Sequence, residues 1–228
     1  MAWHGTAWLG LAGRGRARQG YTQVYSTEDN KISKGVNTMS MYITYNVTLK
    51  GISPLLMHNS GGVNPIDPIN KAKKKISGKR NKTDEDYEKL ARLEWESGLY
   101  LDADEKVIIP GENIEAMLIM AGKKHKLGPK CKAGIICDGD FKLTYDGPKA
   151  LEKLYKDGRF TDTRVVRIMR ASIMRTRPIF RVWSLDVEIM YRPDELDENQ
   201  IQDILETAGG IIGLCDYRPR FGRFEIEK

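Results

Sequence analysis

Residues 183–189 read Trp-Ser-Leu-Asp-Val-Glu-Ile, in which apolar and polar side chains alternate at every position. A period of two puts the apolar set on one face of a β-strand and the polar set on the other. The stretch 42–50 alternates in the same way, and its apolar positions are Ile43, Tyr45, Val47 and Leu49. We therefore expect two strands that each turn one face toward a hydrophobic core.

Apolar side chains recur at helical spacing over 114–121 and 201–208, which predicts two core helices, the second of them ended by Gly209-Gly210. Another helix is expected to begin after Thr83, an N-cap residue followed by three acids, and to stop at Gly98. A short helix is expected at 148–155, and short strands are expected at 107–109, 135–145, 164–170, 173–177 and 224–226.

With insertions set aside, the order of elements is strand, helix, strand, strand, helix, strand. We therefore expect an α+β fold with a ferredoxin-like β-α-β-β-α-β core. A lysine-rich insertion at about 60–106 and a basic hairpin at about 159–181 interrupt it. At roughly 150 residues per domain, the chain has room for one such domain, over 41–228.

Residues 1–40 have a different character, because they begin with a segment rich in Gly, Ala and Arg and have no apolar periodicity. This composition predicts a disordered tail, with a basic arm that touches nucleic acid as the alternative. Arg14, Arg16 and Arg18 follow the weakly apolar part, whereas a secretory signal would begin with its positive charges. Since no run of about 18 apolar residues predicts a membrane span either, we expect a cytoplasmic protein without a membrane partner.

The residues that could hold a metal or a disulfide framework are few. Cys131, Cys137 and Cys215 lack the paired spacing of a zinc site or a disulfide-rich domain, which favours a reducing compartment. Asp138 and Asp140 flank a glycine at a spacing that suits a cation and a turn equally. We expect no metal and no cofactor.

Catalytic machinery is also sparse. The chain has no Walker loop and no Ser-His-Asp arrangement. His58 follows the first strand, where a general base could act, but His125 lies in a lysine cluster and His4 in the expected tail. We therefore expect no catalytic residues and no enzyme activity.

The net charge of +6 is concentrated in a few segments. Seven basic residues and no acid lie within 71–82, five lysines and no acid within 123–132, and six arginines and no acid within 164–181. Acids crowd instead into 84–96 and 194–206. Local charge, more than net charge, is therefore expected to select the partner.

The arginine-rich segment points most directly to a partner. Arginine presents a planar fork that binds phosphate at two points and stacks on bases. Six arginines without a local acid therefore favour nucleic acid, and the alternative is that they pair with acidic helices across the fold. The lysines of 71–82 predict a surface loop, whereas those of 123–132 follow a helix end, where cations complement the helix dipole.

The stretch 209–224 reads Gly-Gly-Ile-Ile-Gly-Leu-Cys-Asp-Tyr-Arg-Pro-Arg-Phe-Gly-Arg-Phe. Glycines let a backbone approach a phosphate, and Tyr217 or Phe221 can stack on a base. A tight connection before an edge strand is the alternative. The predicted nucleic-acid-binding residues are Arg164, Arg167, Arg170, Arg175, Arg177, Arg181, Tyr217, Arg218, Arg220, Phe221, Arg223, Lys73, Lys74, Lys75, Lys123 and Lys124.

Three short motifs carry a family resemblance. They are Gly51-Ile52-Ser53-Pro54-Leu55-Leu56 after the first strand, Ile109-Pro110-Gly111-Glu112-Asn113-Ile114 at the first core helix, and the glycine-rich loop 213–222. Over about 41–228 the chain resembles the RAMP superfamily, the RNA-binding proteins of CRISPR effector complexes. The resemblance implies a ferredoxin-like fold whose inserted basic hairpin, here 159–181, packs against a guide strand.

The chain is also similar to phage-encoded proteins, through Ser-Pro-Leu-Leu-Met-His at 53–58 and Arg-Pro-Arg-Phe-Gly-Arg-Phe at 218–224. It departs from the RAMP pattern at Glu112 and Glu115, where small or basic residues are more usual, and in having fewer glycines in its loop. Because of these departures, the way in which RNA lies on the first core helix in that family is not carried over to this chain.

We expect a non-catalytic protein of phage or prophage context that binds single-stranded DNA or RNA. Segregated charge predicts head-to-tail association into a homo-oligomer or filament along the strand. No residue pattern reads the 2′-hydroxyl, so the choice between DNA and RNA stays open. The alternatives are a subunit of an RNA-guided complex, a small endoribonuclease that uses His58, and a protein-interaction module such as a host-defence inhibitor or a virion component.

Overall fold

The computed structural model of the protein describes residues 41–169 and 171–227. The tail expected at 1–40 and the predicted site residue Arg170 lie outside the described residues. The chain divides into two units, and the description below concerns the unit Met39–Lys228. Its mixture of helices and antiparallel sheets confirms the expected α+β class.

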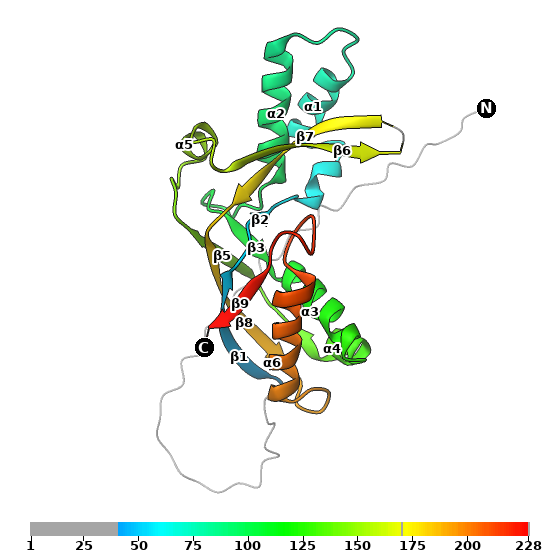
Figure 1. The fold of residues 1–228 in the computed structure, drawn as a ribbon, viewed down its shortest axis with the longest axis vertical. Coiled ribbons are helices and arrows are strands. Elements are labelled where there is room, and N and C mark those ends of the chain that lie inside the picture. Colours follow the sequence, from blue (N-terminus) through cyan, green and yellow to red (C-terminus); the bar gives the residue numbers. More distant parts are fainter. Residues whose placement is uncertain (1–40, 170, 228) are drawn as a thin grey trace, which may run out of the picture. The chain divides into compact units, whose positions relative to one another are not determined.

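A central antiparallel sheet has the strand order β3-β5-β8-β1-β9 (Figure 1). The first strand therefore lies between β8 and the last strand, and pairs with both. The strands are β1 (Ile43–Gly51), β3 (Ile108–Pro110), β5 (Asp140–Tyr145), β8 (Trp183–Tyr191) and β9 (Phe224–Glu227), and the short β4 (Ile135–Ile136) also pairs with β8.

The alternation seen in the sequence becomes the burial pattern of the two central strands. Leu185 and Ile189 of β8 are fully buried, as is Leu49 of β1. Trp183 packs over Gly51, where a Cβ atom would overlap its indole ring, and its Nε1 donates to the carbonyl of Ser53 at 2.8 Å. This contact fixes the chain at the point where β1 ends.

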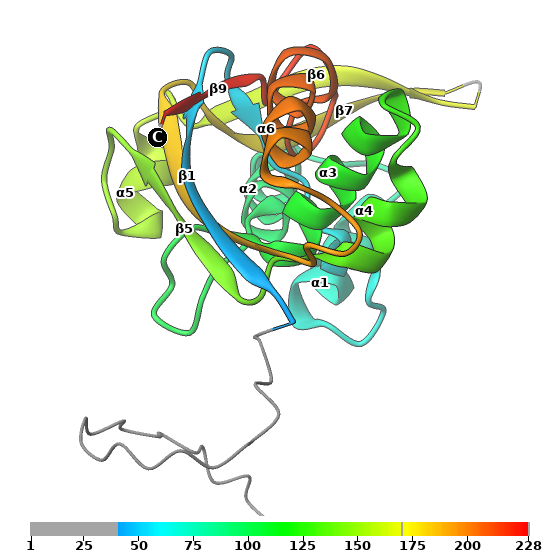
Figure 2. The ribbon, with the colours of Figure 1, turned by 90° about the horizontal axis from the view of Figure 1, so that it is seen from below.

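Two helices, α3 (Gly111–Lys124) and α6 (Glu198–Thr207), cover one face of this sheet (Figure 2). Both expected core helices are thus confirmed, and their buried apolar side chains are Ile114, Met117, Leu118, Ala121, Ile201, Ile204 and Leu205. The glycine pair does not end the second helix, because a π-helical turn, η2 (Ala208–Ile212), carries the chain on to Gly213. Gly209 packs against β9, where a Cβ atom would overlap the carbonyl of Phe224.

The first part of the lysine-rich segment 71–82 belongs to a helix, α1 (Pro68–Ser77), so the expectation of a loop is wrong for 71–77, whereas 78–82 forms the irregular connection to the next helix. Asp67 caps it by accepting from the backbone of Asn70, Pro68 occupies its first turn, and Ile76 is buried. Lysine is a good helix former, so the lysine run does not oppose the helix that the cap begins. The next helix, α2 (Asp84–Gly98), begins with the expected cap at Thr83.

A second antiparallel sheet has the order β2-β7-β6. It contains β2 (Leu55–Leu56) and the hairpin formed by β6 (Thr161–Ile168) and β7 (Ala171–Phe180). The remaining elements are η1 (Ser60–Val63), α4 (Gly128–Gly134) and α5 (Leu151–Lys156). The strand expected at 135–145 is interrupted near Gly139, whose φ of 96° separates β4 from β5.

None of the helices over 41–169 and 171–227 combines the length and apolar character needed to cross a bilayer.

Candidate nucleic-acid interface

The β6–β7 hairpin is attached to α2 through one carboxylate. Glu94 accepts a hydrogen bond from the guanidinium of Arg175 and, at 3.0 Å, another from the backbone N–H of Thr176. Gly98 at the end of α2 leaves room for Pro178, since a Cβ atom there would lie 2.7 Å from the proline ring. One face of β7 is therefore held against the insertion.

The C-terminal loop, residues 213–223, lies beside the same hairpin (Figures 1 and 2). The Arg177 Nε atom lies 3.2 Å from Oδ2 of Asp216, an ion pair that lacks the angles of a hydrogen bond. The guanidinium of Arg164 lies 5.3 Å from the ring centroid of Tyr217 and 4.7 Å from that of Phe221. Two basic motifs about forty to fifty residues apart in the chain thus meet at one place.

The glycines of this loop are required by the backbone conformation of the loop itself. Gly213 and Gly222 have φ values of 82° and 74°, and a Cβ atom on either would overlap a carbonyl oxygen of the loop. The backbone N–H of Gly222 donates to the carbonyl of Pro54, and that of Asp216 donates to the carbonyl of Leu56. The loop is a tight, packed connection, as the alternative interpretation of the sequence proposed.

Most of the described hairpin arginines already have partners. Arg164 pairs with Asp162, Arg175 with Glu94 and Arg177 with Asp216, and Arg181 donates to a backbone carbonyl of Arg159. The acids that pair with these arginines lie outside 164–181: Asp162 stands two residues before Arg164, Glu94 belongs to α2 and Asp216 belongs to the C-terminal loop. The absence of acids within the segment therefore did not mean that its arginines are unpaired. Within the described ranges, the Arg167 side chain is exposed and makes no hydrogen bond or ion pair, although the residue itself pairs with Ser172 in the β6–β7 ladder.

In the C-terminal loop, Tyr217 is 46% exposed, and the side chains of Arg218, Arg220 and Arg223 are also exposed. Phe221 is instead 8% exposed and packs with Leu56 and Ile179, and Arg164 lies over its ring. The expectation that Phe221 can stack on a base is therefore corrected.

Of the two aromatic residues in this loop, Tyr217 is therefore the one whose side chain is exposed enough to stack on a base.

The predicted lysines fall in two places. Lys73 is partly buried and donates to Oγ of Ser97 at 2.8 Å, whereas Lys74 and Lys75 are exposed on α1. Lys123 and Lys124 are exposed at the end of α3, near the contact between His125 and Thr207, and within the described part of the chain neither makes a hydrogen bond or ion pair with the hairpin. The structure therefore brings Lys73 to the hairpin and leaves the α3 pair apart.

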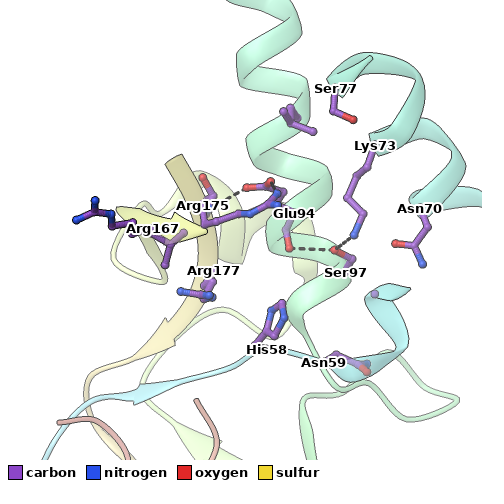
Figure 3. A pocket seen from close by; sticks show the side chains of 14 residues that line it. His58, Asn59, Asn70, Lys73, Ser77, Glu94, Ser97, Arg167, Arg175 and Arg177 are labelled. Atoms are coloured by element: carbon purple, nitrogen blue, oxygen red, sulfur yellow. Dashed lines mark hydrogen bonds and ion pairs between the residues drawn. The ribbon is translucent and has the colours of Figure 1, made fainter. Parts of the chain in front are cut away.

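A pocket of about 510 Å³ lies between α1, α2, η1 and the hairpin (Figure 3). His58, Lys73 and Arg177 converge on it, and Glu94 and Ser97 line it from α2. Its remaining lining residues are Asn59, Gly62, Asn70, Ser77, Leu90, Val166, Arg167, Arg175 and Thr176. Sequence reasoning missed Asn59, Asn70 and Glu94, because nothing in their local pattern indicates that distant segments meet around them.

The pocket lowers the pKa of two of its own groups. Burial lowers the pKa of His58, Asp216 opposes the shift, and Arg177 and other cations add to it. Burial likewise lowers the pKa of Lys73, and the neighbouring charges of Glu94 and Arg175 act in opposite directions on it. The imidazole is therefore held in its neutral form at neutral pH, inside a positive surrounding.

Over the described ranges, no group of three or more His, Cys, Asp or Glu side chains is arranged to hold a metal. Asp138 and Asp140 line a separate hollow with Glu112 and Glu115. Burial raises the pKa of the Cys215 thiol to about 12, so it is not poised as a thiolate nucleophile.

No family model matches this chain, and a search of curated proteins finds no match either.

Proposed function

We propose that this protein binds single-stranded nucleic acid through the β6–β7 hairpin and the C-terminal loop, without chemistry of its own. One observation carries the proposal: the pairing of Arg177 with Asp216 and of Arg164 with Tyr217 sets an exposed aromatic ring and three exposed arginines beside the hairpin. Neither motif alone distinguishes a binding surface from an ordinary basic loop.

The chemistry of this surface suits a single strand. The exposed guanidinium groups of Arg218, Arg220 and Arg223 can each contact backbone phosphates, which releases counterions and makes the affinity depend on salt. Tyr217 can stack on an unpaired base of any sequence, because every base has a π face. Arg164 at 5.3 Å and the Phe221 ring at 5.9 Å both contact the Tyr217 ring, and the remaining exposed surface of Tyr217 is what a base would stack on.

We also propose that the core is ferredoxin-like and that the chain is a RAMP-like protein of phage or prophage context. The order β9-β1-β8-β5 supports this, because the crossover through α3 skips β8 and the crossover through α6 skips β1. Such paired skipping crossovers are the arrangement of a split β-α-β fold. In two of the three motifs that suggested the family, Gly51 packs against Trp183 and Gly111 packs against the carbonyl of Cys137.

The test is fluorescence anisotropy with labelled single-stranded DNA, single-stranded RNA and duplex at several salt concentrations. The informative variant is Arg218→Gln/Arg220→Gln, since both side chains are exposed. Lys153→Gln/Lys156→Gln, on the exposed side of α5, removes the same charge from a surface outside the proposed interface. We expect the first variant to bind about tenfold more weakly and with a shallower salt dependence, and the second to bind like the native protein.

Variants of Arg175 or Arg177 would be poor tests of binding. Both side chains hold the hairpin to its neighbours, so their loss would change the fold as well as the surface charge.

Three other outcomes would replace the proposal. No binding at low salt would leave a protein partner as the function of the basic surface. Cleavage of RNA that His58→Ala abolishes would assign an endoribonuclease. Co-purification with a guide RNA and partner proteins would assign a subunit of an RNA-guided complex.

A further inference from the structure

We propose that the pocket between α1, α2, η1 and the β6–β7 hairpin binds a phosphomonoester, either on a free mononucleotide or at the phosphorylated end of a strand. The inference deepens the proposed function and rests on it where the ligand is a strand end. It assigns this pocket a role that differs from that of the C-terminal loop, which contacts internal phosphates and bases.

The size and enclosure of the pocket suit one nucleotide. Its volume is about 510 Å³, within the range of pockets that hold small ligands. Helices α1 and α2 wall one side, the hairpin another, and the segment with His58 and Asn59 the floor (Figure 3). Because the insertion and the hairpin both contribute, the pocket exists only where these two additions to the core meet.

The charge of the lining suits a dianion. Four cationic side chains, Lys73, Arg167, Arg175 and Arg177, line the pocket with one carboxylate, Glu94. Asp216 pairs with Arg177 and adds a second carboxylate to Glu94, so the four cations exceed the two carboxylates by two charges. A phosphomonoester approaches a charge of −2 above its second pKa of about 6, whereas a diester in a strand has −1.

Burial in this positive surrounding acts on two groups of the lining. The pKa of Lys73 is lowered because its ammonium group is partly buried, and Glu94 and Arg175 act on it in opposite directions. The pKa of His58 is lowered chiefly by burial, Asp216 opposes that shift, and Arg177, Lys73 and Arg175 add to it. An anion bound between these groups would offset the cost of keeping Lys73 charged.

An uncharged group points to a nucleotide and not to phosphate alone. The Asn70 amide donates to the carbonyls of Gly61 and Asn64, and its Oδ1 atom is buried without a hydrogen-bond partner. A buried acceptor of this kind costs free energy unless a donor reaches it. Asn70 and Lys73 line the same pocket, so a sugar hydroxyl or a base amino group beside the phosphate would supply that donor once the Asn70 amide turns its Oδ1 atom toward the pocket.

The experiment is isothermal titration calorimetry with inorganic phosphate, nucleoside 5′-monophosphates and the matching nucleosides. Anisotropy then compares oligonucleotides that carry a 5′-phosphate, a 3′-phosphate or no terminal phosphate. We expect monophosphates to bind about tenfold more tightly than nucleosides or phosphate alone, and a terminal phosphate to add a similar factor for one end of the strand. Binding of the free monophosphate without any gain at a strand end would identify the free mononucleotide as the source.

Lys73→Gln should remove most of this gain, whereas Lys89→Gln, an exposed change on α2, should leave it intact. If Lys73→Gln fails to fold, Arg167→Gln takes its place, because the Arg167 side chain is exposed and makes no hydrogen bond or ion pair with the described residues. Equal binding of phosphorylated and unphosphorylated ligands would overturn this inference and leave strand binding through the loop standing. If the native protein binds mononucleotides but does not bind single strands, the proposed function is overturned and the inference about the pocket stands.

Discussion

At the scale of single residues, the ion pair between Arg177 and Asp216 joins the hairpin to the C-terminal loop. The two side chains are 13% and 33% exposed, and the Nε to Oδ2 distance is 3.2 Å. A partly buried guanidinium that loses its counter-charge is destabilising, and at a fully buried pair the loss reaches about 3–5 kcal/mol. The exposure of Asp216 reduces that figure through solvent screening.

We therefore expect Asp216→Asn to lower the free energy of unfolding by about 1–3 kcal/mol. Equilibrium urea denaturation measures it, with Asp203→Asn on the exposed face of α6 as the control. Equal stability of the two variants would mean that the pair does not hold the loop.

His58 gives a pH-dependent test of the pocket. Burial lowers its folded-state pKa below the ordinary value of 6.5, and Arg177, Lys73 and Arg175 add to this effect. The unfolded chain then binds the proton more readily, so the stability linked to neutral His58 is complete above 6.5 and is lost as the pH falls through the lowered pKa.

We expect acidification from neutral pH to lower the urea midpoint of the native protein more than that of His58→Asn. Both proteins should be compared under conditions of equal salt. Parallel pH profiles of the two would show that His58 titrates alike in the folded and unfolded chains.

At the scale of elements, the hairpin depends on α2 through Glu94, whose side chain is 9% exposed. Glu94→Gln keeps an acceptor for the backbone of Thr176 and removes the charge that faces Arg175. Hydrogen bonds to charged groups contribute roughly 1.5–3 kcal/mol, and the exposure of Arg175 lowers this.

We expect Glu94→Gln to destabilise the protein by about 1–2 kcal/mol and to speed hydrogen exchange of β7 amides. Glu88→Gln, on the exposed surface of α2, is the matched control. Unchanged exchange in β7 would indicate that apolar packing, such as Pro178 against Gly98, holds the hairpin without help from the carboxylate.

At the scale of the whole molecule, much of the acidic surface of α2 is neutralised within the domain. Asp86 pairs with Lys79, Glu94 with Arg175 and Glu96 with Arg92. In the described ranges, the exposed Asp203 and Glu206 of α6 have no such basic partner. Asp84, Glu85 and Glu88 of α2 are likewise exposed and without a basic partner among the described residues, so head-to-tail association along a strand could use either helix as its acidic side, and substitutions on α6 distinguish the two.

We expect sedimentation with oligonucleotides of about 40 residues to detect more than one protein per strand at low salt. Asp203→Asn/Glu206→Gln should reduce that number without weakening binding to short oligonucleotides, and added salt should do the same. A single protein per strand at every salt concentration would exclude this mode of association.

The sequence alone determined the core of this protein. The alternation at 183–189 and 42–50 and the helical spacing at 114–121 and 201–208 each correspond to an observed strand or helix. These predictions succeeded because a periodic pattern of apolar residues directly reflects which face of an element is buried. The helix at the start of the lysine run could also have been predicted from the sequence, because Asp67 and Pro68 are typical of an N-cap and a first helical turn.

Only the tertiary structure decided which basic and aromatic side chains are free. Tyr217 and Phe221 lie four residues apart in one loop, yet one is exposed and the other is buried against Leu56 and Ile179. The partners of Arg175 and Arg177 are distant in the chain, and so are the walls of the pocket around Lys73. Such contacts depend on strand register and on how insertions pack, and local periodicity carries no information about either.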